Sequence, residues 1–292
     1  MENRTFTPKK SYCIALGFFD CMHLGHQEIF RTAINFATKA GIGVAVFTFN
    51  TDANKASGKQ LYAYSERVEL YKKQGISEVI AYPFNDETKG KSGEEFLDEL
   101  VVNYGAVAFC CGEDYRFGAG ASCGVDFLKD YCDKNGLTLI IAPTVVSNGE
   151  KVSSTTIKSL ITAREIERAN ALLSEPYFIQ GEVVKGRGVG HIFGFPTANI
   201  VMREDRISLS EGVYGGYITI ENKSYRAVTN IGAKPTFGDY TPTIESYIVG
   251  YNGNAYGKTA KLSLVKYLRP IKKFDSPDAL REQIYMDAKW TE

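Results

Sequence analysis

The chain has 292 residues, a length that favours two domains over one. Its 34 basic and 34 acidic side chains cancel, which argues against a general nucleic-acid binder. No apolar run is long enough to span a bilayer, and the first residues lack the pattern of a signal peptide. Because the 6 cysteines also form no metal-type pairs, we expect a reduced, cytoplasmic protein with no membrane or nucleic-acid partner.

In the first half of the chain, apolar runs typical of buried strands alternate with segments of helical periodicity. This alternation predicts an α/β Rossmann-like domain with a parallel sheet and right-handed crossovers. Ligands of such sheets bind beyond the carboxyl ends of the strands. The expected strands cover residues 12–16, 44–49, 77–82, 107–111 and 137–142, and the expected helices cover 29–41, 65–74, 92–101 and 124–135.

The character of the sequence changes after residue 160. The segment Thr162–Glu165 has the pattern of a helix capping box and predicts a helix that links two domains. Short segments rich in β-branched and aromatic residues then predict a small antiparallel barrel with a C-terminal helix. The expected strands cover residues 177–184, 213–220, 225–230, 243–249 and 261–267, and the last helix covers 277–288. The expected domains are residues 1–160, a linker helix over 161–176 and a barrel domain over 177–292.

The turn between the first strand and the first helix carries His23 and His26, with Gly25 between them. Free backbone N–H groups and the helix dipole favour an anion at such a turn. Two imidazoles there can donate hydrogen bonds to a phosphate and stabilise the charge that develops during a displacement. The alternative is a pair of unrelated surface or capping histidines. Because two of only 3 histidines in the chain stand close together around a glycine, we favour the phosphate site.

A second candidate segment, Gly112–Gly118, follows the fourth expected strand. Its terminal glycines let the backbone approach a ligand closely. Asp114 and Arg116 offer hydrogen bonds, and Phe117 offers a stacking surface. The alternative is a turn held by a structural pair of the aspartate and the arginine.

The third candidate segment, Val152–Lys158, follows the last expected strand and combines hydroxyl groups with a cation just before an expected helix. Such a cluster can clamp a triphosphate, although Ser and Thr are also common helix caps. All three segments are expected at the same end of the sheet. Together they therefore predict a nucleotide site there.

The second domain contains a glycine-rich segment, Lys185–Gly190. Its glycine spacing matches neither a P-loop nor a Rossmann turn. Taken by itself, the segment is also compatible with a simple hairpin. Thr197 and Asn199 follow in a compact motif in which Pro196 fixes the backbone, and their oxygen atoms can hold Mg²⁺ and its phosphates. Glu245 lies in an alternating strand. Facing a cavity it could take a proton from a substrate hydroxyl, whereas most strand glutamates are solvated.

The ordered set of these motifs resembles the prokaryotic bifunctional riboflavin kinase/FMN adenylyltransferase (FAD synthetase) family over nearly the whole chain. In the first domain the matching motif residues are Gly17, Phe19, Asp20, His23, Gly25, His26, Gly112, Asp114, Arg116, Phe117, Gly118, Ser153, Ser154, Thr155 and Ile157. Those that the resemblance implies bind the substrates are Gly17, Phe19, Asp20, Gly25, Gly112, Asp114, Arg116, Phe117, Ser153 and Thr155. In the second domain the matches are Gly194–Asn199, Gly212–Tyr214, Asn230–Gly232, Pro235–Phe237, Tyr256–Lys258 and Leu268–Arg269, and the family's catalytic glutamate falls on Glu245.

The resemblance implies a six-stranded barrel and two ATP-dependent reactions. The barrel domain would phosphorylate riboflavin to FMN with Mg²⁺ on Thr197 and Asn199 and with Glu245 as the base. The first domain would adenylylate FMN to FAD and release pyrophosphate. It implies that the charge of that step is stabilised by His23, His26, Ser154 and Lys158. The further binding residues expected in the barrel domain are Lys185, Gly186, Gly188, Gly190, Pro196, Asn230 and Arg269.

The sequence departs from the family pattern mainly in the first domain. Cys21 replaces a glycine, Lys158 replaces an arginine, and Phe47–Asp52 lacks the usual prolines; in the barrel domain Tyr247 replaces a histidine. Two alternatives therefore stay open: an active kinase with a weakened or inactive adenylyltransferase domain, or a non-catalytic flavin-binding protein. A cytidylyl-type transferase would share the histidine turn but not the barrel. We expect a monomer or a weak homo-oligomer that takes ATP, riboflavin and FMN as small-molecule substrates.

Overall fold

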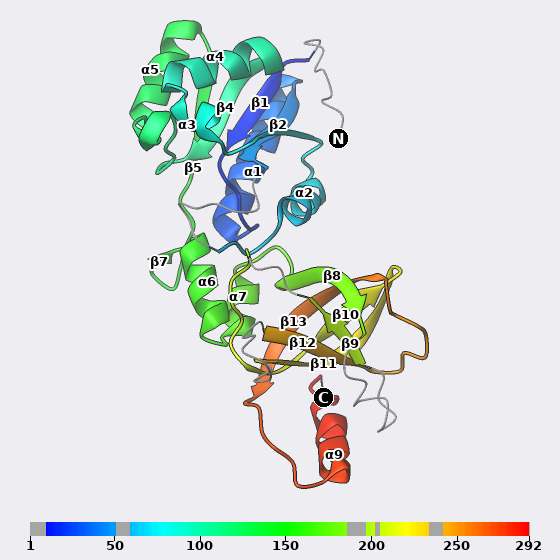
Figure 1. The fold of residues 1–292 in the computed structure, drawn as a ribbon. Coiled ribbons are helices and arrows are strands. Elements are labelled where there is room, and N and C mark those ends of the chain that lie inside the picture. The colour runs from blue at the N-terminus through cyan, green and yellow to red at the C-terminus, as the bar shows by residue number, and fades with distance from the viewer. Residues whose placement is uncertain (1–9, 51–58, 186–196, 202–204, 234–241, 292) are drawn as a thin grey trace. The chain divides into compact units, whose positions relative to one another are not determined.

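The computed structural model of the protein describes residues 10–50, 59–185, 197–201, 205–233 and 242–291 (Figure 1). The chain divides into two compact units, Met1–Ser154 and Thr155–Glu292. The domain and linker boundaries expected from the sequence stay predictions, as does the cytoplasmic location. Within the described ranges, every helix is too short or too polar to cross a membrane.

The first unit is built on a five-stranded sheet in the order β3-β2-β1-β4-β5, in which all neighbouring strands are parallel (Figure 1). This confirms the α/β domain predicted from the alternating segments. The central strand β1 is buried along its whole length, which explains its unbroken apolar sequence. The strands are β1 Tyr12–Leu16, β2 Gly43–Phe49, β3 Glu78–Tyr82, β4 Ala106–Gly112 and β5 Thr138–Ala142, with a small hairpin of β6 Val146–Ser147 and β7 Glu150–Lys151.

The helices of the first unit begin and end at signals that the sequence carries. A capping box of Ser92 and Glu95 begins α4, and Gly41, in the left-handed region at φ 66°, ends α1. The helices are α1 Leu24–Ala40, α2 Tyr64–Lys73, α3 Asp86–Gly90, α4 Gly93–Tyr104 and α5 Val125–Asn135, with a 3-10 turn at Ala119–Ala121. The short helix α3, capped by the side chain of Asn85, was not predicted.

The capping box predicted at Thr162 is wrong. Thr162 is the last residue of α6, Ser154–Thr162, and its hydroxyl donates back to the carbonyl of Lys158 at 2.9 Å. Arg164 then adopts a positive φ of 66°, and the next helix, α7, begins only at Ile166 and runs to Ala171. The same boundaries correct a second expectation, because Lys158 lies inside a helix and not before one.

The second unit is a closed barrel of six antiparallel strands in the order β10-β11-β12-β9-β8-β13. A hydroxyl pair, Thr229 and Ser246, lies among the buried strand residues, with oxygens 2.9 Å apart and no exposed surface. The tight turn Glu221–Asn222 joins β10 to β11 with positive φ at both residues, as a two-residue hairpin requires. The strands are β8 Phe178–Val184, β9 Thr197–Ile200, β10 Gly212–Ile220, β11 Lys223–Ala233, β12 Pro242–Ile248 and β13 Thr259–Arg269.

The C-terminal helix α9, Pro277–Asp287, lies beside the barrel strands (Figure 1), as predicted within one residue. A small apolar cluster joins the segment after this helix to the barrel: Ala288 and Trp290 pack with Val213 and Val228. A Cβ on Gly215 would lie 2.6 Å from the Trp290 indole, so the glycine lets the ring lie directly on strand β10. The helix thus closes one side of a cavity on the outer face of the barrel.

Candidate functional site

The first candidate site begins with the turn between β1 and α1. Phe19 has a φ of 47° and a ring that is 1% exposed, and a Cβ on Gly17 would lie 2.7 Å from this ring. The turn therefore needs glycine at position 17 because the aromatic ring folds back over it.

Two buried side chains of α2 hold this turn in place. Arg67, which has no exposed surface, donates to the carbonyl oxygens of Phe18 at 2.9 Å and Phe49 at 2.7 Å. The Tyr71 hydroxyl donates to the carbonyl oxygen of Phe19 at 2.7 Å. Burial raises the pKa of Tyr71 to about 12. No sequence pattern indicated either residue, because their partners lie in other elements.

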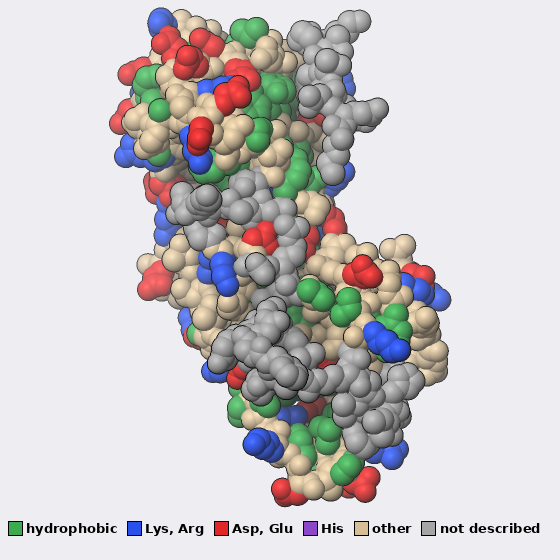
Figure 2. Space-filling model, in the orientation of Figure 1, with side chains coloured by type: hydrophobic (Ala, Val, Ile, Leu, Met, Phe, Trp, Pro, Cys, Tyr) green, Lys and Arg blue, Asp and Glu red, His purple; other side chains and the backbone are tan. Residues whose placement is uncertain are grey.

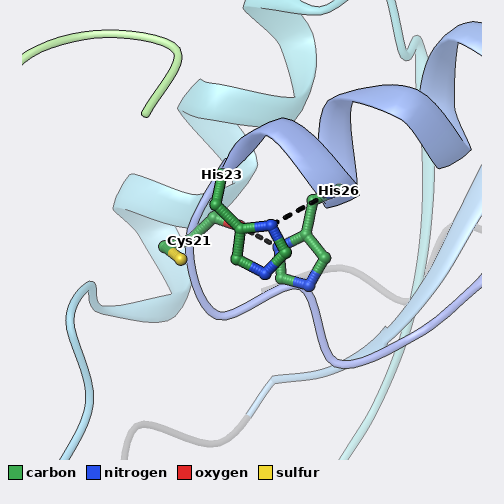
Figure 3. Close-up of side chains that lie close together, drawn as sticks. All are labelled: Cys21, His23 and His26. Atoms are coloured by element: carbon green, nitrogen blue, oxygen red, sulfur yellow. Dashed lines mark hydrogen bonds between the residues drawn. The ribbon is translucent and has the colours of Figure 1, made fainter. Parts of the chain in front are cut away.

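His23 and His26 lie at the start of α1 with their rings stacked, 3.7 Å between centroids and 21° between planes (Figure 3). The backbone N–H of His26 donates to Nδ1 of His23 at 3.2 Å, so His23 is the N-cap of the helix. Nδ1 of His26 bonds to the carbonyl oxygen of Cys21, a contact in which the nitrogen must be the donor. This network assigns a proton to Nε2 of His23 and leaves a lone pair on Nε2 of His26.

Burial keeps both imidazoles neutral. It lowers the pKa of His23 to about 2, and it also lowers the pKa of His26 despite the nearby Asp20 carboxylate. A Cβ on Gly25 would lie 3.1 Å from the His23 ring, so the glycine between the histidines makes room for that ring. The pair therefore presents one donor and one acceptor and carries no charge.

Ser154 joins the start of α6 to the histidine turn. Its hydroxyl donates to the carboxylate of Asp20, and it lies 3.7 Å from Sγ of Cys21. Asp20 and Cys21 are both buried, at 6% and 0% exposure. The predicted hydroxyl cluster thus reaches the histidine turn through Ser154, which contacts Asp20 and Cys21.

A cavity of about 250 Å³ lies at this turn, and the three predicted segments all contribute to it. Its lining includes Gly17, Phe19, His23, Gly25, His26, Gly112, Asp114, Ser153 and Ser154 from the predicted set. Lys151 also lines it and donates to Asp114 at 2.7 Å, an interaction that lowers the pKa of this carboxyl. The aspartate of the second segment therefore pairs with a lysine of the β6–β7 hairpin and not with an arginine of its own turn. The short hairpin carries no motif, so the lysine was missed.

Arg116 and Phe117 belong to a neighbouring cavity of about 730 Å³ instead. Phe117 is 7% exposed and packs against Phe96 with ring centroids 5.8 Å apart, so it is part of the core as well as of this wall. Aromatic side chains dominate the lining: Phe18, Phe47, Phe49, Tyr82, Phe84, Phe96, Tyr115 and Phe117. Such a wall can stack on a planar ring system.

Thr155 and Lys158 line neither cavity and belong to the second unit.

The second candidate site lies on the outer face of the barrel. The Thr197 hydroxyl on β9 donates to the Glu245 carboxylate on β12 at 2.9 Å. Asn199 of β9 and Asn230 of β11 stand directly opposite Glu245 in the strand register. Because paired residues of antiparallel strands share a face, these side chains gather around the carboxylate.

A cavity of about 300 Å³ opens beside Glu245 and is closed by α9. Its lining includes Thr197, Val213, Val228, Asn230, Glu245, Tyr247, Arg269, Phe274, Leu280, Ile284 and Asp287. Arg269 makes bonds to both carboxylate oxygens of Asp287, with Nη2 to Oδ2 at 2.7 Å. The predicted binding arginine is thus held by an aspartate of α9 that no sequence pattern indicated. A second cavity of about 380 Å³, lined by Thr197 and residues of 251–256, adjoins the same threonine.

The remaining predicted residues are placed as follows. Lys185 is exposed just after β8, whereas Gly186, Gly188, Gly190 and Pro196 lie outside the described residues. On the face of the molecule shown in Figure 2, acidic and basic side chains are interspersed, as a chain without net charge would have them.

Comparisons with known proteins match both halves of the chain. The riboflavin kinase family profile matches residues 173–292, and the FAD synthetase family profile matches residues 6–156. The bifunctional riboflavin kinase/FMN adenylyltransferase of Listeria monocytogenes is 31% identical over 95% of this chain and 90% of its own. The chain belongs to the bifunctional riboflavin kinase/FMN adenylyltransferase family.

Other similar proteins cover the same length. The Bacillus subtilis member of this family is 30% identical over 94% of this chain and 89% of its own. A Streptococcus pneumoniae crystal structure described as a macrolide-efflux protein superposes with a TM-score of 0.88, at 31% identity, over 99% of this chain and 95% of its own. The matched region therefore includes both units of the chain.

Two departures from the family pattern lie within these sites. Cys21, in place of the usual glycine, has its thiol beside the serine that begins α6. Tyr247, in place of the usual histidine, lines the cavity next to Glu245, and burial raises the pKa of its hydroxyl. Thr51 and Asp52, where the family has prolines nearby, lie outside the described residues.

Proposed function

We propose that the barrel unit phosphorylates riboflavin to FMN and that the first unit adenylylates FMN to FAD, each with its own ATP. One observation carries the proposal: Thr197 lines two cavities of the barrel, and its hydroxyl donates at 2.9 Å to Glu245, which lines one of them. A nucleotide in one cavity and a flavin in the other would bring the γ-phosphate and the ribityl hydroxyl together at that pair. Pure binding would not need a carboxylate there.

In the barrel reaction, Glu245 accepts the proton of the terminal ribityl hydroxyl. The oxygen of that hydroxyl forms a bond to the γ-phosphorus as the bond to the β-phosphate oxygen breaks, which gives FMN and ADP. The Thr197 hydroxyl donates to the carboxylate and so keeps it pointed at the cavity. Arg269, fixed by Asp287, supplies positive charge to the flavin side of the site.

Magnesium fits the same site. Thr197 and Asn199 offer a hydroxyl and an amide oxygen on one face of β9, and Mg²⁺ prefers such oxygen ligands together with substrate phosphates. When bound, the ion would neutralise charge on the phosphates of ATP. The strand register, which sets Asn199 opposite Glu245, would hold the ion beside this carboxylate.

In the reaction of the first unit, the phosphate of FMN is already ionised and needs no base. One of its oxygens forms a bond to the α-phosphorus of ATP while the bond to the β-phosphate oxygen breaks, which releases pyrophosphate. The Nε2–H of His23, the Ser154 hydroxyl and Lys151 line the phosphate cavity and stabilise the developing charge. Bound phosphate favours protonation of His26 at Nε2, which converts that acceptor into a second donor. The aromatic cavity of about 730 Å³ takes the flavin ring.

Product chromatography tests this proposal. The purified chain is incubated with Mg²⁺-ATP and either riboflavin or FMN. We expect FAD from both substrates. FMN from riboflavin without FAD from either substrate would favour the kinase with a silent first unit, for which the buried Cys21 is the structural reason to consider. Absence of any product would favour a non-catalytic flavin-binding protein and overturn the proposal.

A further inference from the structure

Three potential metal ligands converge at the first site. The ligand atoms of Cys21, His23 and His26 all lie within 4.8 Å of one another, and within the described residues they form a group of three that could hold a metal. Figure 3 shows the two imidazoles side by side with the thiol next to them, on the turn before α1 and the first turn of that helix. We propose that these residues form a binding site for Zn²⁺ or a similar thiophilic divalent ion.

The donor set suits this ion. Zn²⁺ binds Cys sulfur and His nitrogen, and three protein ligands leave a fourth position for water or substrate. The His26 ring already donates its Nδ1 proton to the carbonyl oxygen of Cys21, the outer hydrogen bond that metal-binding histidines usually make. Its Nε2 lone pair is thereby available. The fourth position faces the phosphate cavity, because both imidazoles line that cavity.

Binding requires a small rearrangement. The stacked rings must tilt so that their lone pairs converge, and His23 must move its proton or release the N–H of His26 from Nδ1. The Cys21 thiol loses one proton as its sulfur bonds to the ion, so each Zn²⁺ bound releases one proton to solvent. No oxidant or further reactant is needed.

The consequence for activity rests on the proposed function. The histidine turn is the one that receives the phosphates of ATP in the first unit, so an ion on His26 prevents that ring from donating to phosphate. Zinc would then stop FAD formation from FMN while leaving the barrel reaction intact. Cys21 would thus make the phosphate-binding turn sensitive to inhibition by zinc.

Metal binding is tested without any substrate. The full chain, reduced and free of metal, is titrated with Zn²⁺ alone against a chromophoric chelator, and with Co²⁺ to detect thiolate-to-cobalt absorption. We expect one site per chain with that absorption. Cys21→Gly and Cys21→Ala should each lose the absorption and bind Zn²⁺ at least roughly 100-fold more weakly. Circular dichroism confirms that the variants fold.

Cys123→Ser is the matched control, because this thiol is only half-buried and lies outside the three-residue group. It should bind zinc as the unmodified chain does. Equal zinc affinity in Cys21→Gly, or loss of binding in the control alone, would overturn the proposal.

A second measurement follows FAD formation from FMN, and FMN formation from riboflavin, at increasing Zn²⁺ in excess Mg²⁺. We expect at least a tenfold loss of FAD formation with the barrel reaction unchanged, and no such loss in Cys21→Gly. Equal inhibition of both reactions would overturn the site-specific effect. If the chain makes no FAD at all, the adenylyltransferase proposal fails, and the substrate-free titration still decides whether the metal site exists.

Discussion

The two candidate sites differ in the groups that line their cavities. In the first unit the cavity is lined by two imidazoles at a helix start, and the Asp114 carboxylate in its lining is paired with Lys151. In the barrel, the Glu245 carboxylate lines the cavity and accepts a hydrogen bond from the Thr197 hydroxyl instead of pairing with a lysine. The difference matches the proposed nucleophiles: an ionised phosphate needs no base, whereas a ribityl hydroxyl does.

The two sites also differ in how the fold builds them. The first depends on turns at the ends of parallel strands, where Gly17 and Gly25 make room for aromatic and imidazole rings. The second depends on strand register, which sets Asn199 and Asn230 opposite Glu245. Substitutions of turn glycines should therefore harm the first site, and loss of a single strand side chain should harm the second.

The largest expected effect comes from Glu245→Gln. Removing the base should lower FMN formation by about 10²–10⁴-fold, while FAD formation from supplied FMN continues at the normal rate. Glu182→Gln, on an exposed position of β8, is the matched control and should change neither reaction. Kinase activity retained in Glu245→Gln would show that the carboxylate is not the base.

The second effect comes from His23→Gln. This change removes a donor from the phosphate cavity and the side-chain cap of α1, so FAD formation from FMN should fall by about 10²–10³-fold. The barrel reaction in the same molecule is the internal control and should be unaffected. A parallel loss of both reactions would show that the change damages the whole chain and not the first site.

A third effect separates the stability of the two units. In Gly17→Ala the new Cβ would lie 2.7 Å from the Phe19 ring, so the first unit should lose about 1–3 kcal/mol of unfolding free energy. Gly90→Ala is the control, since nothing lies within 4 Å of its added Cβ. Urea unfolding is followed by circular dichroism and by fluorescence of the single tryptophan, Trp290, which lies in the barrel unit. If the unfolding midpoint of the first unit were the same in Gly17→Ala and in the unmodified chain, the expected loss of stability would be contradicted.

The smallest effect concerns alkaline pH. The pKa of Tyr71 is raised to about 12 in the folded chain, so its contribution to stability is complete below pH 10 and is lost as the pH rises toward 12. The loss should be roughly 1 kcal/mol for each pH unit in that window. Tyr71→Phe should be less stable at pH 8, because Phe19 loses a hydrogen bond, but should show a shallower decline above pH 10. Parallel declines in the two proteins would exclude this role.

Local signals in the sequence predicted much of the fold. The apolar run of β1 gave its bounds, and the capping box at Ser92 gave the start of α4, because both depend on neighbouring residues. Strand β9 was missed, since its four residues lie in a motif that the sequence presents as a ligand-binding turn. The capping pattern at Thr162 was misread because a hydroxyl within hydrogen-bonding reach of the preceding turn can equally end a helix.

The candidate sites were predictable as positions but not as contacts. The three segments of the first unit meet because the carboxyl ends of parallel strands lie at one edge. The side chains that pair with the predicted residues lie in other elements of the chain. Lys151 donates to Asp114 in the first unit, and Asp287 accepts from Arg269 in the barrel. Such pairs depend on how whole helices and strands pack, so no local sequence pattern predicts them.

The closure of the barrel has a consequence for synthesis of the chain. Strand β13 pairs with both β8 and β10, so the five earlier strands can form only an open sheet until residues 259–269 have left the ribosome. At roughly 5–20 residues per second, the edge of β8 stays unpaired for several seconds. During that interval the nascent barrel exposes two strand edges to mispairing, whereas the five strands of the first unit have all been made. The order of translation therefore gives this chain one half that can fold early and one that must wait.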